Sequence, residues 1–310
     1  MSRRVTAILV AAIAAIAIAA LVDSLRGDDR ASTSSPPPPT TTEQRSPPTV
    51  AGRLAARQIT GVLYAAVREG QICRVEAIAL PSLDLSALIG DAACRIHVSP
   101  SGRVAAGGGC PGKRVATQTG AGFRSLAGCA PAWRPDGRLT FVRNGDVVEL
   151  REPCASIQPC LAVVVPRSRF PGRIIELAWL GPTRLAALVQ GSGGPLDRSI
   201  AIVDGGRLVS APPPCCPMDR YLEAVGDRLF VRSRGPDSPF LLFDARGRFL
   251  GRDALPGYLS DGRSFAASPD GSWVASTLGD TIEIYHAGTS HPLDPVELDF
   301  TAVDLGWGTS

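Results

Sequence analysis

Ser268-Pro269-Asp270-Gly271-Ser272-Trp273 is the stretch of this chain that decides its fold. Pro269 fixes φ for the first central position of a turn, Asp270 suits the second, and Gly271 supplies the positive φ that follows. The apolar residues after the turn can pair back as a strand, so the stretch predicts a β-hairpin. Related sequence motifs occur at residues 132–142 and 98–106. Because one hairpin cannot bury its own apolar face, a repeat of this kind sets the whole architecture.

Short apolar segments separated by turns continue from about Gly52 to the end of the chain, and no helical stripe interrupts them. The segments group into units of about 40–45 residues, each predicted to hold up to four antiparallel strands, which is typical of a propeller blade. The first strands of these units are expected at Arg95–Val98, Ala130–Trp133, Ile174–Trp179, Tyr221–Val225, Phe265–Ala267 and Thr301–Trp307.

The two ends of this region complement each other. Thr301–Trp307 looks like a first strand without a continuation, whereas Gly61–Val67 and Ile72–Ile78 form a hairpin without a first strand. Joining them completes a sixth blade and leaves no unpaired sheet edge between the chain ends. The sequence therefore predicts an all-β fold, a six-bladed β-propeller of four-stranded antiparallel blades closed by its N- and C-terminal strands.

The repeated sequence motif also resembles that of a known family. Trp133–Arg138 and Ala267–Ser272 resemble the W-S-P-D-G-K repeats of TolB-like β-propellers, over roughly residues 60–310. The repeats at Gly181–Arg184 and Val225–Arg228 depart from that pattern, so those two blades rest on spacing and strand content. The resemblance implies a propeller fold and says little about function, because propellers include both binding proteins and enzymes.

The N-terminal region predicts a membrane anchor. Residues 1–4 are short and basic, and residues 5–22 form an 18-residue apolar run without a charged side chain. A membrane-spanning helix needs roughly 17–25 such residues. A cleaved signal peptide is the alternative, with residues 17–19 as a possible cleavage site. The charges on the two sides of the run place the N-terminus in the cytoplasm and the rest outside, in a single-pass membrane protein.

A linker and one large domain follow the predicted anchor. Residues 23–52 are rich in Pro, Ser and Thr and lack apolar periodicity, which predicts a disordered spacer. Residues 53–310 are expected to form the propeller. The net charge of +3 over 310 residues is small and does not suggest nucleic acid as a partner.

The even number of cysteines predicts disulfides in the expected extracytoplasmic compartment. Short separations along the chain favour the pairs Cys73–Cys94, Cys110–Cys129 and Cys154–Cys160, while Cys215 and Cys216 bond either each other or two different partners. A zinc site is the rival interpretation. It would need closely spaced cysteine pairs or nearby histidines, and the sequence has neither.

Three carboxylates are the candidate site. Glu176, Glu223 and Asp304 lie in predicted first strands, which line the central channel of a propeller. They could converge there and bind a cation or a basic group. The alternative is ordinary pairing with arginines such as Arg95, which holds the corresponding place in its own blade. No catalytic residue set, metal site or cofactor motif is predicted.

These patterns favour a binding or scaffolding module in the cell envelope, held to the membrane by its N-terminal helix and contacting another envelope protein. Its small-molecule ligand, if any, is unknown. One rival is a propeller-type hydrolase or lactonase with a carboxylate-bound cation at the channel, which would need carboxylate, Asn or His ligands. Another is the sensor arm of an envelope signalling system.

The topology can be tested directly. If residues 5–22 anchor the chain with the propeller outside, protease added to intact spheroplasts should degrade the large domain, as followed by immunoblotting. Complete protection of that domain in intact spheroplasts, with degradation only after lysis, would contradict the assignment.

Overall fold

The computed structural model describes residues 49–309, apart from residues 71, 120–121, 152–159, 195–196, 214–215, 217, 234–239, 253–263, 287–292 and 294. The predicted anchor at residues 5–22 and most of the predicted linker lie outside this range. None of the helices within it has the length and apolar character needed to cross a bilayer.

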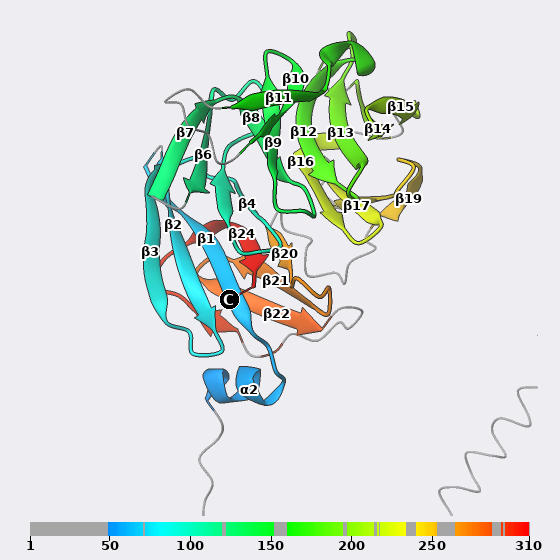
Figure 1. Cartoon of the computed structure of the whole chain (residues 1–310). Coiled ribbons are helices and arrows are strands. Elements are labelled where there is room, and N and C mark those ends of the chain that lie inside the picture. Colours follow the sequence, from blue (N-terminus) through cyan, green and yellow to red (C-terminus); the bar gives the residue numbers. More distant parts are fainter. Residues whose placement is uncertain are drawn as a thin grey trace, which may run out of the picture. The chain divides into compact units, whose positions relative to one another are not determined.

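Six antiparallel sheets of four strands each make up most of the described part of the chain (Figure 1). Blade 1 consists of β24 (Ala302–Gly308), β1 (Gly61–Glu69), β2 (Ile72–Leu80) and β3 (Leu85–Ala92). Blade 2 consists of β4 (Ile96–Val98), β5 (Val104–Ala106), β6 (Arg114–Thr119) and β7 (Gly122–Ala127). Blade 3 consists of β8 (Cys129–Trp133), β9 (Leu139–Arg143), β10 (Asp146–Leu150) and β11 (Leu161–Val165).

The other three blades repeat this plan. Blade 4 consists of β12 (Arg173–Trp179), β13 (Arg184–Gln190), β14 (Arg198–Asp204) and β15 (Arg207–Ser210). Blade 5 consists of β16 (Met218–Val225), β17 (Arg228–Ser233), β18 (Phe240–Asp244) and β19 (Phe249–Arg252). Blade 6 consists of β20 (Phe265–Ala267), β21 (Trp273–Leu278), β22 (Thr281–His286) and β23 (Val296–Glu297). The six-bladed propeller is therefore confirmed, and each predicted first strand is the first strand of its blade.

The repeated turn forms as its residues predict. Ser268 accepts a hydrogen bond from the Gly271 amide at 2.8 Å, and its own amide donates to the Trp273 carbonyl at 2.8 Å. Gly271 has a φ of +72°, a conformation that side chains with a Cβ disfavour. In the turn at residues 134–138, the Gly137 amide likewise donates to the Arg134 carbonyl, and the Arg134 amide donates to the Arg138 carbonyl, one residue earlier than in blade 6; both bonds are 2.9 Å.

Apolar contacts between neighbouring blades hold the ring together. Each of the six buried clusters in the described chain joins side chains of adjacent blades. Between blades 5 and 6, for example, Tyr221, Phe240 and Phe265 pack ring against ring with centroids 5.1–6.0 Å apart. Such aromatic pairs add about 0.5–1.5 kcal/mol beyond their area burial. No blade buries its faces alone, as a repeat architecture requires.

The ring closes through β24 and β1, as the chain ends predict. The two strands pair antiparallel with Leu63 opposite Trp307 and Ala65 opposite Leu305, and a bulge follows at Ala66. Gly61 allows the close approach at the start of β1, because a Cβ there would lie 2.5 Å from the Gly308 carbonyl oxygen. The last strand of the chain is therefore the inner strand of the first blade.

One helix differs from the expectation. The sequence predicts linker up to residue 52 and no helix, but α2 (Val50–Ala56) forms directly after Thr49. The Thr49 hydroxyl accepts a hydrogen bond from the Gly52 amide at 3.1 Å, which caps the helix. Leu54 is 1% exposed and packs with residues of blades 1 and 6. With only seven residues, α2 is too short to show a helical period, so packing and capping stabilise it rather than a visible pattern.

Two predicted disulfides are confirmed, Cys73–Cys94 and Cys110–Cys129. Cys160 and Cys216 are also disulfide-bonded, and the described chain has no free cysteine. Cys154 and Cys215 lie outside the described residues, so the pair Cys154–Cys160 and the partner of Cys216 stay predictions. The oxidised cysteines favour the disulfide interpretation over a zinc site, because a metal needs free thiolates.

Candidate functional site

Arg95, which directly precedes β4, is a largely buried cation among the inner strands, with its side chain 14% exposed. Its guanidinium donates to the Leu222 carbonyl at 3.1 Å and lies 4.1 Å from the Tyr221 ring centroid, both on β16. Its Nε is 3.8 Å from Glu176 Oε1 on β12. One side chain of blade 2 thus contacts blades 4 and 5 across the channel.

The three predicted carboxylates surround this cation. Burial alone would lower the pKa of Arg95. The nearby Glu176, Asp304, Tyr221 and Glu223 raise it by more than burial lowers it, so the guanidinium stays charged. Glu176 is 1% exposed, Asp304 is buried and Glu223 is partly buried. The structure thus gathers all three carboxylates near Arg95, which the sequence named as their alternative partner. Their role as ligand contacts stays a prediction.

Asp304 and Glu176 differ in their hydrogen bonds. Asp304 accepts from the Ile96 amide at 2.8 Å and from the Ser264 hydroxyl, which itself accepts from the Leu305 amide at 3.2 Å. Asp304 therefore links blade 1 to blades 2 and 6. By contrast, neither carboxylate oxygen of Glu176 has a hydrogen-bond partner.

Burial shifts the protonation of these groups. It raises the pKa of Glu176 to about 7, with Arg95 opposing the shift and the Asp304 charge adding to it. Burial likewise raises the pKa of Glu223 to about 7, against the effect of Arg95. The pKa of Asp304 is also raised by burial, although Arg95 and its hydrogen bonds oppose this. The channel therefore carries groups that change charge near neutral pH.

A glycine loop between β5 and β6 covers Glu176. Gly109 approaches so closely that a Cβ would lie 2.3 Å from Glu176 Oε1. The Cys110 amide donates to the Ile175 carbonyl at 2.8 Å, and the Cys110–Cys129 disulfide ties the loop to blade 3. The loop explains why Glu176 is buried.

A cavity of about 490 Å³ opens where the inner strands end. Residues from all six inner strands line it, together with the turns at Pro100, Pro135 and Pro269. The described lining includes the carboxylates of Glu223 and Asp270 but no lysine or arginine. We call this cavity the channel mouth. It is acidic and partly apolar.

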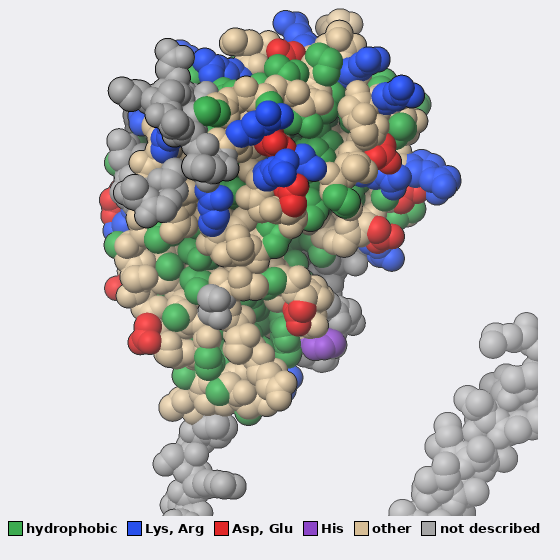
Figure 2. Space-filling model, in the orientation of Figure 1, with side chains coloured by type: hydrophobic (Ala, Val, Ile, Leu, Met, Phe, Trp, Pro, Cys, Tyr) green, Lys and Arg blue, Asp and Glu red, His purple; other side chains and the backbone are tan. Residues whose placement is uncertain are grey.

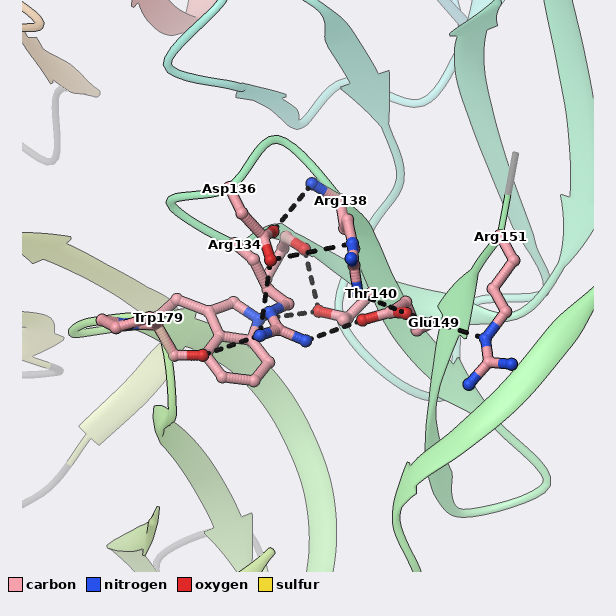
Figure 3. Close-up of polar contacts among 9 residues, drawn as sticks. Arg134, Asp136, Arg138, Thr140, Glu149, Arg151 and Trp179 are labelled. Atoms are coloured by element: carbon pink, nitrogen blue, oxygen red, sulfur yellow. Dashed lines mark hydrogen bonds and ion pairs between the residues drawn. The ribbon is translucent and has the colours of Figure 1, made fainter. Parts of the chain in front are cut away.

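Tryptophans at the ends of inner strands fix the walls of the channel mouth. Trp133 donates its indole N–H to the His97 carbonyl of blade 2 at 2.9 Å, and Trp179 donates to the Thr140 hydroxyl of blade 3 at 2.8 Å. Figure 3 shows Trp179 beside Thr140 and under Arg134, whose guanidinium carbon is 5.0 Å from the ring centroid. These contacts join neighbouring blades, so the mouth has a rigid rim.

Sequence reasoning missed several of these residues. Ser264, Tyr221 and Gly109 each act through a partner far along the chain, and no motif marks them. Among the described residues, no three His, Cys, Asp or Glu side chains are placed to hold a metal ion.

Comparison with known proteins supports the fold. No family model matches the sequence, and no curated protein matches it. The structure is similar to the crystal structure of TolB from Acinetobacter baumannii, with a TM-score of 0.51 and 14% identity over 80% of this chain and 66% of that one. The chain thus spans slightly less than two thirds of that TolB chain.

Two further structures show weaker similarity. A chain of the mitotic checkpoint complex matches with a TM-score of 0.46 and 15% identity, over 91% of this chain and 92% of that one. The β-propeller domain of Cps50 (Swd1) from Myceliophteria thermophila matches with a TM-score of 0.48 and 13% identity, over 77% of this chain and 87% of that one. At these identities the TolB similarity establishes the propeller fold and nothing about function.

The raised pKa of Glu176 predicts a pH-dependent stability. Between the ordinary pKa of 4.5 and the folded value of about 7, the carboxyl is protonated only in the folded state, so stability falls as pH rises through this window. We expect the free energy of unfolding to decrease from pH 5 to pH 7.5, and Glu176→Gln to remove on the order of 3 kcal/mol of that decrease. Urea unfolding at each pH measures it.

Glu297→Gln on β23 is the control, since Glu297 is exposed. It should leave the pH slope unchanged. An equal slope in the wild type and in Glu176→Gln would contradict the raised pKa of the buried Glu176 carboxyl.

Proposed function

We propose that this chain is a binding module of the cell envelope that holds a partner protein at the channel mouth. The observation that carries the proposal is the cavity of about 490 Å³ on which all six blades converge. Concave sites with a few polar groups in apolar surroundings are the usual binding sites of proteins. The predicted anchor at residues 5–22 would hold the propeller at the membrane, and the predicted linker, which ends before α2, would hold it away from the bilayer.

The rim favours binding of a preformed surface rather than closure over a small molecule. The turns at Pro100, Pro135 and Pro269 are short and internally hydrogen-bonded, and Trp133 ties the strand before the Pro135 turn to the strand before the Pro100 turn. A rigid rim loses little conformational entropy on association, which favours affinity.

The charges in the channel mouth indicate which partner group enters it. Glu223 and Asp270 offer acceptors, and the described lining has no cationic side chain. The entering segment would therefore present hydrogen-bond donors or a basic side chain among apolar contacts. The hydrolase alternative lacks support from a ligand set, because the described residues offer no metal cluster.

Site-specific photocrosslinking tests the proposal. A benzoylphenylalanine placed at Pro100 or Pro269, both exposed at the channel mouth, should give the same discrete adduct in intact membranes that contain the full chain. The matched controls are Val209 and Leu250 on the outer strands, which are 58% and 51% exposed. These positions should give no such adduct.

Two results would contradict the proposal. One is the absence of any adduct from both mouth positions at full expression. The other is the same adduct with equal yield from the outer strands, which would indicate contact without a defined site.

A further inference from the structure

A second cavity lies beside the channel mouth, between blades 2 and 3. Its volume is about 540 Å³, and the residues that line it are Arg103, Asp136, Gly137, Arg138, Leu139, Glu149, Leu150 and Arg151. We call it the basic groove. It shares a turn with the channel mouth, because Pro135 lines the mouth and Asp136 lines the groove. Figure 2 shows basic and acidic side chains gathered in the upper middle of this face.

A buried glutamate organises the groove. Glu149 on β10 is 4% exposed and accepts from Arg134 at 2.7 Å and from Arg138 at 3.3 Å, and it lies 3.9 Å from Arg151 Nε (Figure 3). Arg134 belongs to the scaffold, since it stacks on Trp179 and donates to the Pro182 carbonyl at 2.8 Å. The charge of Glu149 is therefore neutralised from within the protein.

The lining of the groove carries a net positive charge, within which Arg138 also pairs with Asp136 at 3.7 Å and Arg103 donates to the Gln118 carbonyl at 3.0 Å. Arg103, Arg138 and Arg151 line it, and Asp136 is the one other acidic residue among its described lining. With Glu149 compensated by Arg134, the balance is +2. The side chains of Arg138 and Arg151 are 58% and 69% exposed, so solvent and ligands can reach them.

The turn itself does not require these arginines. In blade 6, Ser268 and Ser272 hold the places of Arg134 and Arg138, yet Gly271 donates to the Ser268 carbonyl at 2.8 Å as Gly137 donates to Arg134 at 2.9 Å. Serine is thus sufficient for the fold of the turn. The arginines of blade 3 add a charged surface beside a buried glutamate and a cavity.

We propose that the basic groove binds an acidic segment, rich in Asp or Glu, of the same partner that occupies the channel mouth. The proposal rests on the function proposed above. Guanidinium groups bind carboxylates through two parallel hydrogen bonds, which gives both strength and direction. An acidic mouth beside a basic groove admits a partner of complementary charge in one orientation, so the groove sets how the partner docks.

The experiment uses a fluorescein-labelled octaglutamate peptide and the full chain in detergent, with fluorescence anisotropy as the readout at low salt. The double variant R138Q/R151Q should weaken the peptide about tenfold or more. The matched control is R228Q/R248Q, because those side chains are 57% and 67% exposed, lie beside aspartates and carry the same total charge. The control should change the Kd less than about twofold, as expected for exposed pairs.

Four results would overturn the proposal. They are equal weakening by the two double variants, unchanged binding in R138Q/R151Q, equal binding of an octaglutamine peptide, and displacement by inorganic phosphate at the same concentration as unlabelled octaglutamate. Thermal melting checks that each variant folds. If the double variant does not fold, R151Q alone must still weaken the peptide more than R248Q alone.

The proposed function and this inference fail separately. If mouth crosslinks persist and octaglutamate does not distinguish the variants, the inference is wrong and the proposed function stands. If octaglutamate binds through Arg138 and Arg151 but no mouth adduct forms, the groove is an acidic-peptide site and the proposed function is wrong.

Discussion

The antiparallel pairing of β24 with β1 is the constraint on which the rest of the structure depends. It joins the last strand of the chain to the first hairpin and makes blade 1 from both ends. Leu305 and Trp307 are buried there, and burying such side chains contributes about 1.5–3 kcal/mol each. The same strand brings Asp304 to the Ile96 amide and the Ser264 hydroxyl. Closure therefore builds the channel wall as well as the ring.

Once the ring is closed, the channel has to accommodate charge away from water. Arg95 compensates part of the charge of three carboxylates, and the raised pKa values of Glu176 and Glu223 show that protons supply more of the compensation. Burying a charge is costly unless it is paired. Hydrogen bonds stabilise the buried Asp304 carboxylate. The Glu176 carboxylate lies against Gly109 and accepts no hydrogen bond.

The parts of this structure that the sequence could predict depend on local patterns. The turn at Ser268–Trp273 and the apolar runs placed all six inner strands, and complementary chain ends predicted the closure. Disulfides across 21 and 19 residues could be paired from their separation. The missed features connect distant residues. Arg95 donates to the carbonyl of Leu222, which is 127 residues away, and the Ser264 hydroxyl donates to the Asp304 carboxylate. Helix α2 was missed because a seven-residue helix held by Leu54 has no readable period.

Hydrogen exchange of the full chain tests closure most directly. If β24 is an integral strand, its amides, such as that of Leu305, exchange only through global unfolding. Their opening free energy and its dependence on denaturant should then equal those of β13, a central strand of blade 4. The contrary result is that the β24 amides exchange through a smaller opening that does not depend on denaturant, while β13 stays protected. This result would contradict the account, because the last strand would then not be an integral part of a closed ring.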